Sequence, residues 1–304
     1  MFDLVTVGHF AIDLIISPRI TRSTATLGGS PTFCSIAAKK LGADVSVISK
    51  VGSDFPSEYI EWLTANGVDL SGLKVVDGAS TTRFILKYEG YGRRLRLKSR
   101  APPIGIEDIP DSLRSRAIHA GPIANELSAE TISELRSLAD VLSLDPQGLV
   151  RLFDREGNVS LRKMGEHKIL RNIDIFKSAT DELKSFVDAA DLPSALKKIS
   201  EHGTEIVIVT KGSKGALVYH RGRVYEIPAC KPRVFVDATG AGDVFIGAFL
   251  AEYIRGKDVP WCACVGSASA SFIVEKRGSS GFGERREVYE RASKAFERVR
   301  TLRI

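Results

Sequence analysis

The sequence feature that most constrains the fold is the stretch from residue 236 to residue 249, Val-Asp-Ala-Thr-Gly-Ala-Gly-Asp-Val-Phe-Ile-Gly-Ala-Phe. The residues that lead into it, 233–236, are mostly β-branched or aromatic, which favours a strand. Small residues follow at 240–242, and after them apolar side chains recur at helical spacing, beginning with Val244 and Phe245. The stretch therefore predicts the end of a strand, a tight turn and the start of a helix.

A helix that begins directly after small residues offers a binding site for an anion. Its first backbone N–H groups have no partner within the helix and carry the positive end of the helix dipole. With Gly240, Ala241 and Gly242 at the turn, a phosphate group can come close to those amides. Asp243 falls in the first helical turn, where its carboxylate could accept a proton from a hydroxyl that attacks the phosphorus. Phosphoryl transfer needs this pairing of a base with donors for the developing charge.

Two interpretations fit this motif. A Gly-Ala-Gly-Asp segment alone is explained by a tight turn before a helix with an acid near its N-terminus. The longer string D-x-T-G-A-G-D-x-F, from Asp237 to Phe245, resembles the C-terminal signature of the ribokinase-like, or PfkB, family of carbohydrate and nucleoside kinases. The resemblance implies that Asp243 is the catalytic base and that the amides of residues 240–242 form the anion hole. It also implies ATP as the donor, with Mg²⁺ arriving on the nucleotide.

The N-terminal part of the chain supplies candidates for binding the acceptor. Residues 2–8 predict a buried first strand that ends at Gly8. Asp13, farther on, is a lone acid between apolar residues. It is either a surface acid at a strand crossing or a buried acid, which would need partners such as the hydroxyls of a polyol. The family resemblance favours the second interpretation, because an acid at this place usually holds the substrate's hydroxyls.

Gly28 and Gly29 precede a helix predicted over residues 32–41. An ordinary Gly-Gly loop would explain the pair, but residues 28–42 resemble the family's N-terminal signature, G-G-x-x-x-N-x-A-x-x-x-x-x-L-G. The asparagine that contacts the sugar in many members is absent, and Thr32 or Phe33 falls near its place. This departure disfavours ribose and fructose, and it brings the chain closer to the inositol-kinase-like members. Gly28, Gly29 and Thr32 are therefore expected to bind the acceptor together with Asp13.

Residues 82–88 and 94–98 alternate polar and apolar side chains around a glycine-containing turn, which predicts a hairpin with one face in water. Together with the strand around Asp13, this hairpin would form a small antiparallel sheet. In the resembling family such a sheet is a lid over the sugar, and often the surface of a homodimer. We expect the lid strands around residues 12–27 and 80–99. The basic alternation from 93 to 100 is better explained by a solvated face than by a nucleic-acid site.

From about residue 117, short apolar strands alternate with helices, as βαβ units with a parallel sheet require. Asp145 and Gln147 follow the strand predicted at 141–145, at the end of a sheet where such folds bind ligands. A capped turn would explain both residues equally well. Glu182 matches the acid of the family's Asn-x-x-Glu segment near the metal and phosphates, whereas the asparagine position is Ala179. The resemblance thus implies only an indirect contact of Glu182 with the metal.

The segment from 205 to 219 reads as strand, glycine turn and strand, and it resembles the family's V-T-x-G-x-x-G-A nucleotide segment. It lacks the spacing of a P-loop, and no helix follows it. The resemblance makes Lys211, Gly212 and Gly215 candidates for binding the nucleotide, although a solvated lysine in a hairpin turn would explain Lys211 too. Gly278 lies in a loop that borders the adenine in family members. The resemblance extends from Gly8 to about residue 281.

The composition sets bounds on the class of protein. An apolar fraction of 43% and a charged fraction of 26% are ordinary for a globular chain. No apolar run is long enough for a membrane span, the N-terminus lacks a signal-peptide pattern, and the four cysteines form no metal-binding pairs, so we expect a cytoplasmic protein without zinc. A net charge of +6 would suit nucleic acid, but the basic residues are mostly dispersed, and a cleft for ATP explains them as well.

These observations predict one α/β domain over residues 1–304, with the ribokinase-like three-layer sandwich of a mainly parallel sheet between helices and a small β lid. The expected activity is ATP-dependent phosphorylation of a sugar or cyclic polyol, with a myo-inositol-like acceptor favoured. A nucleoside kinase of the same family is the alternative, and a non-catalytic sugar or nucleotide sensor is a third. ADP in place of ATP stays open at this point, as does a homodimer through the lid.

Overall fold

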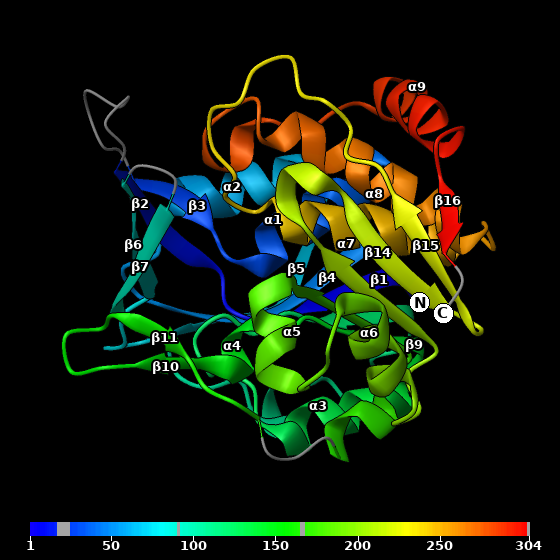
Figure 1. Cartoon of the computed structure of the whole chain (residues 1–304). Helices are drawn as coiled ribbons and strands as arrows, with labels where there is room; N and C mark the ends of the chain where they lie inside the picture. Colours follow the sequence, from blue (N-terminus) through cyan, green and yellow to red (C-terminus); the bar gives the residue numbers. More distant parts are fainter. Residues whose placement is uncertain (17–24, 90–91, 165–167, 303–304) are drawn as a thin grey trace.

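A large mixed sheet forms the centre of the computed structural model, which describes residues 1–16, 25–89, 92–164 and 168–302 (Figure 1). Among these residues ten strands lie in the spatial order β16 (Arg300–Leu302), β15 (Arg223–Ile227), β14 (Ala216–His220), β13 (Ile206–Thr210), β12 (Ile175–Ala179), β9 (Ala139–Leu144), β8 (Ser115–Ala120), β1 (Phe2–Val7), β4 (Val45–Gly52) and β5 (Asp69–Val76). The pairs from β13 to β5 are parallel, and β14, β15 and β16 add an antiparallel edge. The mainly parallel sheet that the alternating pattern predicts is therefore confirmed.

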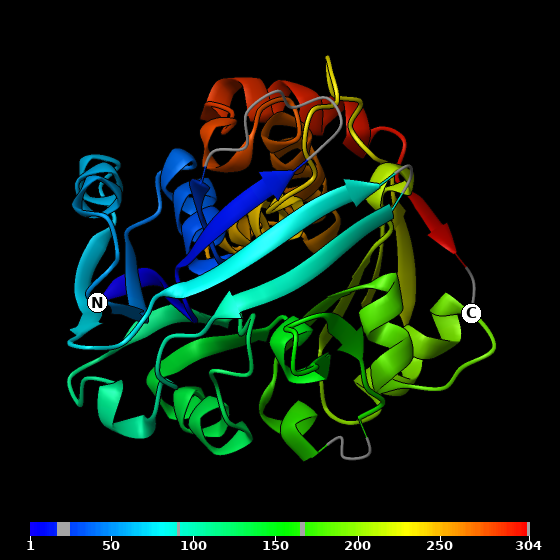
Figure 2. The ribbon, with the colours of Figure 1, turned by 90° about the vertical axis from the view of Figure 1, so that its left-hand side faces the viewer.

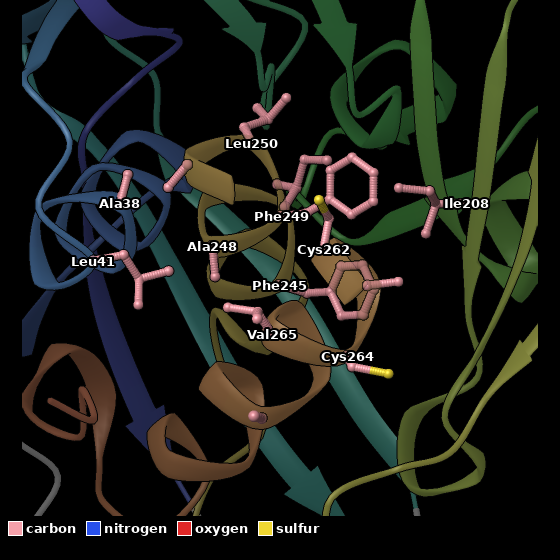
Figure 3. Packing of buried hydrophobic residues seen from close by; sticks show 14 of the residues in the cluster. Ala38, Leu41, Ile208, Phe245, Ala248, Phe249, Leu250, Cys262, Cys264 and Val265 are labelled. Atoms are coloured by element: carbon pink, nitrogen blue, oxygen red, sulfur yellow. The ribbon is translucent and has the colours of Figure 1, made fainter. Parts of the chain in front are cut away.

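Helices cover both faces of this sheet, as a parallel sheet with buried strands requires (Figure 1). One face carries α1 (Ser30–Lys40), α2 (Ser57–Ala65), α7 (Ala241–Tyr253), α8 (Val259–Ile273) and α9 (Arg285–Phe296). The other face carries α3 (Ala129–Leu135), α5 (Thr180–Phe186) and α6 (Leu192–Ser200). Figure 3 shows the core on the first face, where Phe245 and Phe249 of α7 lie between α1, α8 and Ile208 of β13. This packing fixes the position of α7, and with it the position of Asp243.

A second, smaller sheet stands apart at one side of the molecule and is seen from its own side in Figure 2. In the described chain it contains β3 (Ala25–Gly28), β2 (Ala11–Ile16), β6 (Thr82–Glu89) and β7 (Gly92–Ser99), in that order. The hairpin of β6 and β7 is confirmed. The prediction of a wholly antiparallel sheet is wrong, because β2 pairs with β6 in parallel. The reason is that β2 enters the sheet directly from β1, so its direction is set by the large sheet and not by a hairpin with β6.

The prediction of a strand over residues 233–236 is also wrong. The chain leaves the sheet at the end of β15, and this run is a loop in which Val234, Phe235 and Val236 are about half exposed. Val236 N donates to Val274 O at 2.8 Å and Arg233 N donates to Glu275 Oε1 at 2.9 Å, so the run is tied to the residues that follow α8. β-propensity needs a neighbouring strand to act on, and none lies beside this segment in the described chain.

Directly after β9, the described chain forms three short elements. They are α4 (Gln147–Val150), β10 (Arg151–Phe153) and β11 (Val159–Leu161), and the two strands form a hairpin of their own. Farther along, Ile173 belongs to the turn before β12. In the described residues we find no helix with the length and apolarity that crossing a membrane would require.

Candidate active site

A cavity of about 70 Å³ lies between the small sheet and the N-termini of α1 and α7. Its polar lining consists of Asp13, Ser30, Gln147, Arg151, Thr239 and Asp243. Its apolar lining consists of Phe33, Phe84, Leu86, Leu95 and Ile123. The small sheet therefore supplies most of an apolar wall, while the large domain supplies most of the polar groups.

The start of α7 is fixed by a glycine with a left-handed backbone. Gly240 has φ 74° and precedes the helix, and a Cβ at this position would overlap the ring of Phe33. Both the conformation and the close contact exclude a larger residue. The turn therefore brings the first amides of a 13-residue helix to the edge of the cavity, with Asp243 in the first turn. The predicted turn and helix are present, and the helix end can stabilise an anion.

Behind this helix end lies a charged side chain that the sequence analysis did not single out. Lys177 of β12 is 4% exposed, and its Nζ donates to Asp145 Oδ2 at 2.5 Å. A Cβ at Gly242 would lie 2.6 Å from the same Nζ, so the ammonium group sits directly against the predicted anion hole. A lysine inside the otherwise apolar strand Ile-Phe-Lys-Ser-Ala was the available signal, since a buried lysine needs a nearby carboxylate or ligand.

The charges around Lys177 are coupled through the buried site. Burial lowers the pKa of Lys177, but the carboxylates of Asp145, Asp243 and Glu182 outweigh it and leave that pKa above its ordinary value. Burial raises the pKa of Asp145, and the nearby Asp243 raises it further against the attraction of Lys177. The pKa values of Lys177 and Asp145 are thus both raised, and the acidic side chains, which outnumber the basic ones around them, contribute to each shift. Lys177 is therefore positively charged, and it is surrounded by more acidic than basic side chains.

Asp243 is oriented by a chain of two further side chains. Gln147 Nε2 donates to Asp243 Oδ1 at 3.3 Å, and Arg151 Nη2 donates to Gln147 Oε1 at 2.6 Å. Both residues come from the short segment of α4 and β10, directly after the C-terminal end of β9. The prediction that Gln147 lies in a ligand site at the end of this strand thus agrees with its place in the cavity lining. Holding one oxygen of Asp243 leaves the other to face a substrate.

Asp13 lies in the cavity wall on β2 and is 5% exposed, so it is buried and not a surface acid. The backbone of β3 runs directly over it, because a Cβ at Gly28 would overlap the Asp13 carboxylate. Gly29 also lines the cavity. Thr32 does not, since its hydroxyl donates to Gly28 O at 2.7 Å and stabilises the start of α1. Its neighbour Ser30 reaches the cavity instead, and the sequence analysis did not identify it.

The nucleotide candidates lie outside this cavity. Lys211 Nζ is 3.5 Å from Glu226 Oε1, and Gly215 packs against the backbone at Ile227. Gly212 begins the turn between β13 and β14 with open space around its Cα. Gly278 N donates to Asp237 Oδ2 at 3.1 Å.

Asp237 is itself buried and accepts hydrogen bonds from three directions. Its Oδ1 receives Thr239 N and the Tyr88 hydroxyl, at 3.0 and 2.7 Å, and its Oδ2 receives Gly278 N. The first acid of the motif therefore ties the turn before α7 both to the small sheet and to the loop after α8. This structural role was not evident from the sequence, because its partners are far away in the chain.

Glu182 lies at the start of α5 and not beside the cavity lining. Its Oε2 accepts a hydrogen bond from Ala179 N at 2.9 Å, which satisfies the first amide of that helix. In the described parts of the chain, no group of three or more His, Cys, Asp or Glu side chains is arranged to hold a metal ion.

Comparisons with known proteins agree with this arrangement. The family profile described as pfkB family carbohydrate kinase matches residues 1–97 and 124–284. The cytidine kinase of Thermococcus kodakarensis is 29% identical over 91% of this chain and 98% of that protein. The inositol 3-kinase of Arabidopsis thaliana is also 29% identical, over 92% of this chain and 76% of that protein.

Among solved structures, a pyrophosphate-dependent kinase in the ribokinase family, complexed with a pyrophosphate analog and myo-inositol, superimposes with a TM-score of 0.81. The match covers 94% of this chain and 99% of that one, at 24% identity. At this identity the likeness shows the fold alone, and it confirms the predicted ribokinase-like architecture with its separate small sheet.

Proposed function

Since the chain belongs to the pfkB family of carbohydrate kinases, we propose that it transfers the γ-phosphate of ATP to a hydroxyl of a small cyclic polyol, with myo-inositol as the favoured acceptor. The observation that carries this proposal is the shared cavity of Asp13 and Asp243. In this proposal Asp13 would hold hydroxyl groups and Asp243 would take a proton, with the amides at the start of α7 beside Asp243. A non-catalytic sensor would have no use for the second carboxylate at a helix N-terminus.

In the proposed reaction, Asp243 accepts the proton of the attacking hydroxyl while Gln147 holds its other oxygen in place. The amides of Gly240, Ala241 and Gly242 donate to the transferring phosphoryl group. Lys177 adds a fixed positive charge behind Gly242, paired with Asp145 so that it stays protonated. These groups are in position before the reaction, so no reorganisation is needed as charge develops.

Magnesium supplies charge neutralisation to the donor phosphates when it is bound. The acidic surplus around Asp145 and Asp243 is consistent with such a cation nearby. Glu182 is proposed to act on the metal only indirectly, through the start of α5, because its carboxylate already accepts a backbone bond. Lys211, Gly212, Gly215 and Gly278 are proposed to border the nucleotide at the same end of the large sheet.

The proposed acceptor follows from the shape and chemistry of the cavity. Phe33 occupies the neighbourhood of the asparagine found in many family members, and it offers an aromatic face instead of an amide. Phe84, Leu86 and Leu95 add an apolar wall from the small sheet. A compact ring with hydroxyls on its rim and C–H groups on its faces fits both surfaces. The inositol 3-kinase relative supports this class of acceptor.

The second candidate is a nucleoside, and the cytidine kinase relative favours it. A nucleoside would place its ribose hydroxyls on Asp13 and its base against the apolar wall. The donor has an alternative as well, since the solved structure with bound myo-inositol belongs to a pyrophosphate-dependent kinase. The anion hole and Lys177 would serve a pyrophosphate as they serve ATP, because both groups recognise phosphate and not the base.

We also propose that residues 1–304 form one domain in which the small sheet closes over the acceptor. The Tyr88 hydroxyl, which donates to Asp237, gives this sheet a direct contact with the turn that precedes α7. Lid closure would exclude water and limit wasteful hydrolysis of the donor. A homodimer through the outer face of the sheet is the proposed assembly.

A kinase assay that detects the spent donor tests these proposals directly. The purified chain is offered myo-inositol, other polyols, ribose, fructose, cytidine and adenosine, each with ATP, ADP or pyrophosphate in the presence of Mg²⁺. We expect the highest kcat/KM with myo-inositol and ATP. Phosphorylation of none of these acceptors with any donor would refute the proposed function.

A further inference from the structure

Two buried polar side chains next to the cavity have atoms with no hydrogen-bond partner among the described residues. They are Ser30 Oγ and His119 Nε2, and both residues are 1% exposed. Ser30 lies at the start of α1 and lines the cavity. His119 lies on β8 behind it. Unpartnered polar atoms are rare in protein interiors, and such groups normally meet a water or a ligand.

Gly121 shows that the two atoms border the same small space. A Cβ at this glycine would overlap Ser30 Oγ and lie 3.3 Å from His119 Nε2. The absence of a side chain at Gly121 therefore leaves room in which the Ser30 hydroxyl can rotate toward the imidazole. Its φ is not in the left-handed region, so close approach and not backbone conformation explains the glycine.

The surroundings of His119 keep its ring uncharged. Burial lowers the pKa of His119 to about 3, and the ammonium group of Lys177 contributes to the shift. The other ring nitrogen, Nδ1, is 3.1 Å from Ser143 Oγ. If Nδ1 carries the proton and donates to Ser143, then Nε2 is an acceptor that needs a donor. The Ser30 hydroxyl borders the same space and is also without a partner in the described structure, so a rotation about its Cα–Cβ bond would make it the nearest candidate donor.

We propose that Ser30 and His119 form a hydroxyl-binding relay, in which an acceptor hydroxyl donates to Ser30 Oγ while Ser30 donates to His119 Nε2. This inference rests on the proposed function and deepens it. It adds a specificity-determining contact at the N-terminus of α1, separate from Asp13 on β2. Ser30 would touch the substrate, and His119 would act as a positioning residue through Ser30.

The relay has a chemical consequence for the class of acceptor. Ser30 can accept from a hydroxyl only if its own proton is directed elsewhere, and His119 provides that direction. A C–H group or a methylene at the same place would leave Ser30 Oγ without a donor in a buried site. The relay therefore selects acceptors with one more hydroxyl than Asp13 alone can hold, and it disfavours the matching deoxy compound.

The test compares Ser30→Ala, His119→Leu, His119→Gln and the double variant Ser30→Ala/His119→Leu with the unaltered chain. The probes are myo-inositol, its single-deoxy analogues and cytidine, and calorimetric binding of each probe without donor is measured beside the kinetics. Ser35→Ala is the matched control, because it removes another buried hydroxyl of α1, one that contacts Thr6 Oγ1 at 2.9 Å and does not line the cavity.

We expect Ser30→Ala and His119→Leu each to weaken acceptor binding and kcat/KM by roughly tenfold to a hundredfold, the usual cost of losing a buried hydrogen bond. The KM of the donor should stay unchanged. The double variant should lose no more acceptor binding than the single variant with the larger loss, since either substitution alone already breaks the relay. One deoxy analogue should bind the unaltered chain and Ser30→Ala equally. His119→Gln, whose Oε1 can accept near the position of Nε2, should restore most of the binding.

Additive losses in the double variant, or equal losses in Ser35→Ala, would overturn the relay. A separate measurement does not depend on the acceptor. Nitrogen-15 NMR of the histidine ring reports its tautomer, and we expect His119 to carry its proton on Nδ1, with the Nε2 signal shifting in Ser30→Ala. A proton on Nε2 would refute the relay even if the kinase assay succeeds. The expected tautomer with no phosphorylated acceptor would instead refute the proposed function.

Discussion

The N-termini of α1 and α7 both begin after a glycine with positive φ and both reach the same cavity, yet they present different groups to it. Gly29 before α1 has φ 89°, and Gly240 before α7 has φ 74°. The first turn of α7 contains Asp243, whereas the first turn of α1 contains no acid. Behind α7 lies the charged Lys177, and behind α1 lies the uncharged His119.

This difference is consistent with separate roles for the two helix ends, one in binding phosphate and the other in binding the hydroxyls of the acceptor. A helix N-terminus attracts anions wherever it occurs, so it cannot by itself separate a phosphate site from a hydroxyl site. The groups around the helix end make the distinction. At α7, a fixed ammonium ion and a carboxylate suit phosphoryl transfer. At α1, neutral hydrogen-bonding groups suit the recognition of hydroxyls. Substitutions at α7 should therefore affect turnover, and those at α1 should affect the choice of acceptor.

The largest effect is expected from Asp243→Asn. The amide preserves the shape of the side chain but cannot take the proton, and loss of a general base typically lowers the rate by ~10²–10⁴. Steady-state kinetics should show this fall in kcat, while donor binding measured by calorimetry changes little. Asp181→Asn is the control, since it makes the same change in the first turn of α5 at an exposed acid. Near-normal turnover in Asp243→Asn would remove this residue from the mechanism.

Gly242→Val tests the anion hole at the same helix end. The new Cβ would lie 2.6 Å from Lys177 Nζ, so it would displace the ammonium group that lies behind the predicted anion hole. We expect kcat to fall by about 10²–10³, as when a donor to a developing negative charge is lost. Circular dichroism should show that the variant is folded. A folded variant with full activity would place the phosphate elsewhere.

These two positions could be predicted from the sequence because the D-x-T-G-A-G-D-x-F string is local. Its turn and helix follow from residues that are adjacent in the chain. Asp13 stands out as a lone acid within an apolar strand, and Gln147 follows the end of a predicted strand. Lys177, Ser30 and His119 could not be placed in the same way. Their roles depend on contacts between separate strands and helices, and each residue in isolation is explained by ordinary burial or capping.

Residues 233–236 show that a local sequence pattern can also predict an element that does not form. The local pattern of Val234, Phe235 and Val236 is that of a strand, but no neighbouring strand in the described chain is available to pair with it. The parallel pairing of β2 with β6 was also hidden, because direction depends on how the chain enters the small sheet. The fold class was predictable from the alternation of strands and helices along the chain. The direction in which strands pair, and the exposure of residues 234–236, depend on the three-dimensional arrangement.

A smaller effect is expected in the pH dependence of stability at the α1 end. The pKa of His119 is about 3 in the folded chain, because burial and then Lys177 lower it, against an ordinary value of 6.5. Between these values the unfolded chain binds a proton that the folded chain does not, so the free energy of unfolding falls as the pH falls below about 6.5. From about pH 7 to about pH 5 this one group should cost about 2 kcal/mol.

His119→Gln should remove that contribution without removing the polar group. Urea unfolding at the two pH values should show a smaller loss of stability in the variant than in the unaltered chain, by about 2 kcal/mol. His202→Gln is the control, because it changes another histidine that lies in an exposed turn. Parallel pH curves for His119→Gln and the unaltered chain would mean that the ring is charged in the folded state.

The smallest predicted effect concerns the acceptor, and it tests the α1 end of the comparison most directly. Asp13 lines the cavity beside Gly29, and in the proposed function it holds acceptor hydroxyls, contacts on which a polyol would depend for nearly all of its binding. A nucleoside gains part of its binding from its base against the apolar wall, so it should lose less when Asp13 is removed. We expect kcat/KM for myo-inositol to exceed that for cytidine by at least about tenfold, or 1.4 kcal/mol, and Asp13→Ala to erase the difference. If cytidine is instead preferred by a similar factor, the α1 end recognises a ribose, and the kinase assignment stands with a nucleoside as its substrate.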